Sequence, residues 1–154
     1  QMLDVNIEVN NAAFQNRPDD MRATVHLCRG NFQSTYAGQG GYEPIAEKYL
    51  VKMNVNGFFM EFDDDRSGDF APLRFLPKDK YVVIGIMTSK NPLLETKEEL
   101  KRRIDAAAKY IPLEQICISP QCGFASTKEG NKLSEENQWR KLERLVEVAD
   151  EVWG

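Results

Sequence analysis

The sequence predicts an α/β fold, because short apolar runs alternate with amphipathic helical patterns. Four runs have the length and composition of buried strands, at 23–28, 57–62, 81–87 and 115–119. Helical patterns follow the first, third and fourth of these runs. Such alternation is typical of parallel strands joined by right-handed crossovers, so we expect four parallel strands with outer helices.

Two architectures fit this alternation, a small doubly wound sheet and part of a (βα)8 TIM barrel. The opening stretch MLDVNIEVNNAAF favours the barrel, since it has the pattern of the last part of a helix, with no cap and no strand before it. A whole barrel typically takes ~250 residues, whereas this chain has 154. We therefore expect the C-terminal half of a barrel as a single partial domain over 1–154. It would contain the end of a preceding helix at 1–16 and four βα units at 23–154, with the N-terminal half absent.

The three helical patterns have clear starts and apolar stripes. Pro44 suits the first turn of one helix, Thr96 and Glu99 form a capping box before the next, and Ser134 is the expected N-cap of the last. The expected buried stripes are Ile45, Tyr49, Leu50 and Met53; Leu100, Ile104, Ala108 and Ile111; and Trp139, Leu142, Val146, Ala149 and Trp153.

Composition and charge exclude several classes of partner. The net charge is −4, from 20 basic and 24 acidic residues, so we expect no nucleic-acid partner. No apolar run approaches the roughly 20 residues that cross a bilayer, so we expect no membrane partner. Three cysteines, an odd number, form no disulfide framework. They indicate the reducing cytoplasm and leave metal binding or catalysis as uses for the thiols.

Soft and acidic metal ligands gather at the carboxyl ends of the predicted strands. His26 and Cys28 stand two positions apart in one strand, so their side chains share a face. Glu61 lies near the end of the next strand, where a buried charge needs a partner, and Cys122 follows the last strand closely. Because active sites of parallel α/β folds lie at this edge, we expect these four residues to form a tetrahedral Zn²⁺ site.

Neighbouring polar residues have plainer interpretations. Cys117 stands in the middle of an apolar strand, so we expect a small buried hydrophobic residue there. The acidic run 63–65 reads as a solvated loop. Arg66 and Ser67 follow Glu61 closely, and we expect them to face the same cavity and to orient a substrate.

Two thiolates in the ligand set indicate a particular chemistry. Hydrolytic zinc sites favour neutral histidines or a carboxylate, which leave the metal a strong Lewis acid for water. Thiolates donate electron density, so such a site suits holding a substrate thiol as a nucleophilic thiolate. The ligand set therefore favours alkyl transfer onto sulfur, with a zinc hydrolase or lyase as the alternative.

At these motifs the sequence resembles the cobalamin-independent methionine synthase family, and especially its short members that lack an extra N-terminal barrel. The resemblance lies in the stretches VHLCRGNF (25–32), GFFMEFDDDRSGDFAPLRF (57–75), 99–127 and 129–154. It implies a (βα)8 catalytic barrel whose zinc ligands fall on His26, Cys28, Glu61 and Cys122. It also implies methyl transfer to the thiol of homocysteine to make methionine, from methyltetrahydrofolate or another donor.

Two departures from that family affect the expected activity. The family's earlier strands carry an acid that holds the homocysteine amine, and those positions do not exist here. Lys90 stands where full-length members have a proton-donating histidine, which bears on the identity of the methyl donor. A catalytically silent zinc-binding fragment is therefore a further alternative. Apolar residues such as Val25 and Phe59 would need the missing half-barrel or self-association to cover them.

Overall fold

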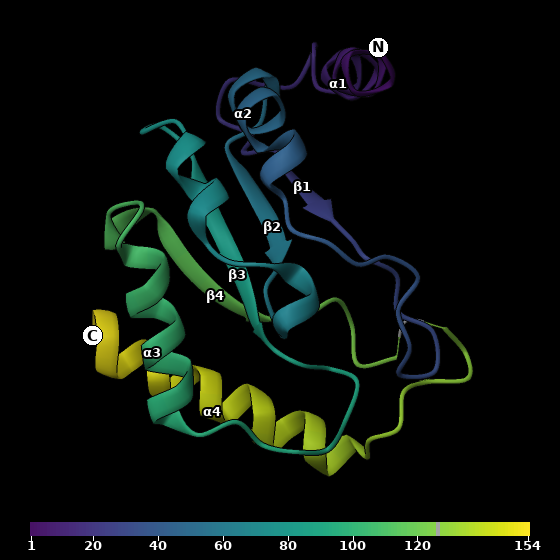
Figure 1. Cartoon of the computed structure of the whole chain (residues 1–154), viewed down its shortest axis with the longest axis vertical. Helices are drawn as coiled ribbons and strands as arrows, with labels where there is room; N and C mark the ends of the chain where they lie inside the picture. The colour runs from purple at the N-terminus through teal and green to yellow at the C-terminus, as the bar shows by residue number, and fades with distance from the viewer. Residues whose placement is uncertain (126) are drawn as a thin grey trace.

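The computed structural model describes residues 1–125 and 127–154 (Figure 1). Its helices are α1 (Met2–Ala13), α2 (Glu43–Lys52), α3 (Lys97–Ala108) and α4 (Glu135–Trp153), and its strands are β1 (Thr24–Leu27), β2 (Gly57–Glu61), β3 (Tyr81–Met87) and β4 (Ile116–Pro120). Short 3-10 helices η1 (Asp65–Ser67), η2 (Ala71–Phe75) and η3 (Leu113–Gln115) stand in the connections.

The four strands form one parallel sheet in the order β1-β2-β3-β4, which confirms the predicted topology. Each strand is joined to the next by a crossover, and all four strands end at the same edge of the sheet (Figure 1). One row of paired residues runs across the whole sheet, through His26, Phe59, Val83 and Cys117. Paired residues of a parallel sheet share a face, so these four side chains point the same way.

The outer face of the sheet carries the hydrophobic core. Phe58, Met60, Val82 and Ile84 alternate with the row described above and are 2% exposed or less. The helices contribute the other side of this core, including Leu50 of α2, Leu100 of α3 and Val148 of α4. Val25 packs half-buried against the same core. The prediction that Val25 would be left uncovered was therefore wrong, because the pleat directs it outward.

The inner face of the sheet is open by comparison. His26 and Cys117 are exposed, Phe59 is 38% exposed and Tyr81 is 37% exposed. Cys117 was predicted to be a small buried hydrophobic residue, and this is wrong. The apolar run around it resembles a strand buried on both faces, but the described residues cover only the outer face.

The predicted capping box of α3 and the predicted N-cap of α4 are both present, and the α4 cap is also a capping box. Thr96 and Glu99 cap α3 reciprocally, and Ser134 does the same with Asn137 at α4. In α3, the buried stripe passes through Ala107, whereas the predicted Ala108 is exposed.

The predicted stripe of α4 is rotated by about one residue. Its buried members are Lys141, Leu145 and Val148, whereas Trp139 and Val146 are 59% and 60% exposed. Lys141 is accommodated because its ammonium group lies 2.7 Å from Glu95 Oε2. A hydrophobic pattern cannot anticipate a buried face that contains a lysine.

No helix in the described part of the chain is both long enough and apolar enough to cross a membrane.

Candidate metal centre

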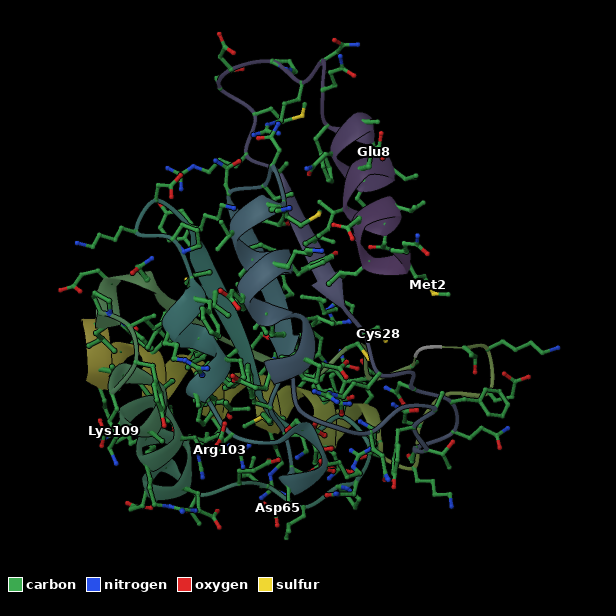
Figure 2. All side chains as sticks on the ribbon, turned by 45° about the horizontal axis from the view of Figure 1, so that its top comes forward. Met2, Glu8, Cys28, Asp65, Arg103 and Lys109 are labelled. Atoms are coloured by element: carbon green, nitrogen blue, oxygen red, sulfur yellow. The ribbon has the colours of Figure 1, made fainter. Side chains whose placement is uncertain are left out.

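The four predicted ligands converge at the carboxyl edge of the sheet. His26 lies within β1, Cys28 just beyond the end of that strand (Figure 2), and Glu61 is the last residue of β2. Cys122 stands two positions after β4. One ligand atom from each of these four residues lies within 4.8 Å of the others, and residues 1–125 and 127–154 contain no other such group of three or more His, Cys, Asp and Glu side chains.

The Glu61 carboxylate is buried and held from one side only. Oε2 accepts the Arg29 backbone N–H at 3.1 Å and the Gln121 amide at 3.4 Å. Oε1 is also buried, and no hydrogen-bond donor contacts it in the described part of the chain. It lies 3.6 Å from His26 Nε2. A buried carboxylate with one free oxygen is costly unless a cation approaches it, so this oxygen is suited to a metal.

The two thiols lie side by side. The Cys28 and Cys122 sulfurs are 3.7 Å apart, and the Gly30 backbone N–H donates to the Cys28 sulfur at 3.2 Å. Burial raises the pKa of the Cys122 thiol, and the neighbouring Glu61 carboxylate and Cys28 raise it further. A bound dication at this position would favour the ionised form of the Cys122 thiol.

Two of the spacings between ligand atoms are close to those of a tetrahedral zinc ion. Two sulfurs that each bind zinc at about 2.3 Å in a tetrahedron lie about 3.8 Å apart, close to the spacing of Cys28 and Cys122. The nitrogen and oxygen ligands of such an ion, each at about 2.1 Å, lie about 3.4 Å apart. His26 Nε2 and Glu61 Oε1 are close to that separation. The donor set of one nitrogen, one oxygen and two sulfurs also suits Zn²⁺.

An open cavity of about 240 Å³ borders these ligands on the inner face. His26, Glu61 and Cys122 line it together with Phe59, Met60, Gly85, Ser119, Pro120 and Gln121. A Cβ at Gly85 would stand 3.2 Å from the Pro120 carbonyl oxygen and 3.4 Å from that of Met60. Gly85 therefore lets β3 approach both neighbouring strands closely beside Glu61.

Arg66 and Ser67 lie in η1, apart from the lining of this cavity. The Arg66 guanidinium pairs with Asp64 and stacks over the Tyr36 ring, 3.5 Å from its centroid. Ser67 is fully buried, and its hydroxyl donates to the Asp64 carbonyl. Both side chains are thus engaged within their own loop and with Tyr36.

Asp63 corrects the prediction of a solvated loop at 63–65. Its side chain is 1% exposed and lies 3.4 Å from Lys90 Nζ. Burial raises the pKa of the Asp63 carboxyl, and the Lys90 charge opposes that shift. A run of three aspartates reads as solvated, but the first of them turns inward to meet a lysine from the loop after β3.

Several residues that support the site were not singled out in the sequence. Gln121 holds Glu61, and the Tyr42 hydroxyl accepts the Glu61 backbone N–H at 2.9 Å and lies 3.3 Å from the Leu27 carbonyl oxygen. Asn31 contacts the loop of Cys122. Gln121 and Asn31 stand within three positions of predicted ligands, and that proximity is a usable signal. Tyr42 precedes a helix far from any ligand in sequence and gave no signal.

Comparison with known proteins agrees with the geometry. The family model described as the catalytic domain of cobalamin-independent synthase matches residues 7–151. The protein YxjH of Bacillus subtilis (strain 168) is 54% identical over 144 residues, which cover 93% of this chain and 38% of that protein. The methionine synthase of Pyrococcus furiosus is 26% identical over 130 residues, which cover 83% of this chain and 32% of that protein.

A solved structure from Listeria monocytogenes, described as a vitamin-B12 independent methionine synthase, superposes with a TM-score of 0.78 at 34% identity. The match covers all of this chain and 42% of that one, and the four parallel strands correspond to half of a TIM barrel. This chain thus spans less than half the length of these relatives. With 7–151 matched by the family model, the chain belongs to the cobalamin-independent synthase catalytic-domain family.

Proposed function

We propose that this chain carries the zinc centre of a methyltransferase that moves a methyl group onto the thiol of homocysteine, making methionine. The observation that carries the proposal is the group of four ligand atoms within 4.8 Å of one another. His26, Cys28, Glu61 and Cys122 are the proposed ligands. Both relatives described as methionine synthases support the choice of reaction.

The ligand chemistry favours sulfur as the nucleophile. A zinc ion held by these residues would bind a substrate thiol and keep it ionised at neutral pH. The Cys28 and Cys122 thiolates supply electron density, and Gly30 N–H supports the first of them. Arg29 and Gln121 fix the Glu61 carboxylate so that Oε1 faces the site. The same electron density makes the site less suited to activating water, which argues against a hydrolase.

The methyl donor is either methyltetrahydrofolate or another methyl compound. Lys90 occupies the place that the family resemblance gives to a proton-donating histidine, and its ammonium group lies 3.4 Å from Asp63. A donor whose leaving group needs no proton would suit this arrangement best. Arg66 and Ser67 remain proposed substrate-orienting residues, and their contacts within η1 favour an effect through the shape of that loop.

Completion of the site requires a further protein surface. The inner face leaves Phe59 and Tyr81 exposed, and two helices expose apolar residues as well. Met2, Val5 and Val9 are exposed on α1, with Met2 extending away from the sheet (Figure 2), and Trp139, Val146 and Trp153 are exposed on α4. A closed barrel would add further strands and helices against a half-barrel of this kind. We propose that a complementary half-barrel, or a second copy of this chain, covers them.

The alternative is that this length of chain binds zinc but is catalytically silent. This alternative is supported by the length of the chain, which covers only 38% of one relative and 42% of another. Free thiols at the site are compatible with the reducing conditions of the cytoplasm, where we propose that the reaction takes place.

X-ray absorption at the zinc edge tests the proposed function. It should be recorded on the chain assembled with a complementary half-barrel, with and without homocysteine. We expect one additional sulfur ligand when homocysteine is added, and turnover should be lost in Cys28→Ser. An unchanged sulfur count in an active assembly would refute direct thiol binding. Zinc binding without turnover in that assembly would favour the silent alternative.

A further inference from the structure

The side chain of Asn31 links the two loops that carry the cysteines. It stands three positions after Cys28, and its Nδ2 donates to the carbonyl oxygens of Cys122 at 2.9 Å and Gly123 at 3.0 Å. An asparagine amide has two N–H donors, so these carbonyls can use both. Cys28 and Cys122 are 94 positions apart in sequence, yet the side-chain amide of Asn31 joins their loops.

Ser89, from the loop after β3, completes the link. It is fully buried, its hydroxyl donates to the Cys122 carbonyl at 2.8 Å, and it lies 3.2 Å from Asn31 Nδ2. The carbonyl of Cys122 therefore receives donors from two separate loops. Asn131 lies on the far side of the same cluster, where its Nδ2 donates to Ser89 O at 2.9 Å and to Gly123 O at 3.3 Å but makes no hydrogen bond to Cys122.

We propose that Asn31 is a positioning residue that sets the spacing of the Cys28 and Cys122 thiols before any metal binds. The 3.7 Å between the sulfurs depends on where two irregular loops lie, because neither cysteine is inside a strand. With the Cys122 peptide fastened to the loop of Cys28, the two thiols keep that spacing. A metal or other thiol-seeking ligand then binds without first ordering the loops. The role rests on the proposed function only for its purpose, since the hydrogen bonds of Asn31 join the two loops through protein atoms alone.

The test uses phenylarsine oxide on the metal-free chain of 154 residues. Each arsenic atom forms two As–S bonds with a thiol pair, and its oxygen leaves with the two thiol protons as one water molecule. The unmodified chain should lose two of its three thiols to the reagent in a single fast step, with Cys117 remaining free. In Asn31→Ala, capture should slow by about tenfold or more, since displacing reacting groups by about 1 Å can cost up to ~100-fold.

Asn131→Ala is the matched control, because it removes an amide from the same cluster but no hydrogen bond to Cys122. It should capture arsenic at the unmodified rate. Equal rates in Asn31→Ala and the unmodified chain, or equal slowing in both asparagine variants, would overturn the proposal. If Asn31→Ala fails to fold, Ser89→Ala replaces it as the test. Arsenic capture by Ser89→Ala should be slowed to an intermediate degree, and no slowing would count against the link.

Zinc affinity gives a second readout of the same role. Asn31→Ala should bind zinc about 10–100-fold more weakly, the range seen when outer-shell partners of metal ligands are removed. Arsenic capture that depends on Asn31 in a chain that binds no zinc would refute the proposed zinc function and leave the positioning role standing. Zinc affinity that is unchanged in Asn31→Ala would overturn the positioning role and leave the zinc function standing.

Discussion

The two faces of the sheet differ in what they bury, and neighbouring residues of β2 show it. Phe58 is fully buried on the outer face, whereas Phe59 is 38% exposed on the inner face. The outer face contributes the helix-covered core, and the inner face carries the candidate metal ligands at its carboxyl edge. The comparison shows that a single step along the strand separates residues that stabilise the chain from residues available for chemistry, because successive side chains point to opposite faces.

The largest expected effect on stability comes from breaking the outer face. Phe58→Ala should lower the free energy of unfolding by about 3–5 kcal/mol, because it leaves a cavity in the core. Phe59→Ala is the matched control and should cost only about 1–2 kcal/mol, since the side chain is already partly exposed. Denaturation by urea, followed by circular dichroism, measures both values. Equal losses would contradict the assignment of the two faces.

Removing a ligand from the inner face should affect metal binding and not the fold. Cys122→Ser should weaken zinc affinity by more than about 100-fold, beyond the loss seen for outer-shell partners, because the tetrahedron no longer closes. Cys117→Ser changes a thiol on the same face, in the row of His26 but outside the group of four ligands, and should keep the wild-type affinity. Competition with a chromophoric chelator measures both affinities. Similar zinc loss in the two variants would refute the ligand assignment.

Exposure of the inner face should also affect association. The chain should form dimers or larger species at rising concentration, or bind a complementary half-barrel, because Phe59 and Tyr81 are left uncovered. Phe59→Ser should shift the distribution toward monomer in size-exclusion chromatography with light scattering. A folded chain that stays strictly monomeric and does not bind the complementary half-barrel would argue against an uncovered inner face.

The smallest effect should come from ion pairs on the outermost helices. Lys101 and Lys97 lower the pKa of Glu151 from 4.5 to about 2. Because the folded-state pKa is lowered, the stabilisation is present above pH 4.5 and is lost as pH falls toward 2. Glu151→Gln should therefore show a slightly flatter fall in stability over that interval. The difference should vanish in 1 M salt, where the Debye length is about 3 Å, and a difference that persisted would exclude these ion pairs as its source.

The sequence was sufficient to predict the elements with strong local patterns. Strand alternation, the H-x-C spacing and the rule that parallel strands end at one edge were enough to predict that the four ligands lie together. The capping box of Thr96 and Glu99 and the N-cap at Ser134 were also predicted, since both depend on residues within one helical turn.

Other features depend on contacts that no local pattern contains. Cys117 has the apolar neighbours of a buried residue, but its exposure depends on what covers the inner face. Asp63 turns inward because Lys90, 27 positions later, meets it. The buried face of α4 is set by the pairing of Lys141 with Glu95 across 46 positions. Long-range charge pairing therefore accounts for Asp63 and Lys141, whereas the exposure of Cys117 follows from what covers the inner face.

The central claim is that Cys28 and Cys122 meet on the inner face to hold a metal. The most direct measurement is a crystal structure of the zinc-loaded chain with diffraction recorded on both sides of the zinc absorption edge. We expect one strong anomalous peak per chain, surrounded by the side chains of His26, Cys28, Glu61 and Cys122. A zinc peak elsewhere, with the two cysteine sulfurs free or bonded to each other, would contradict the account.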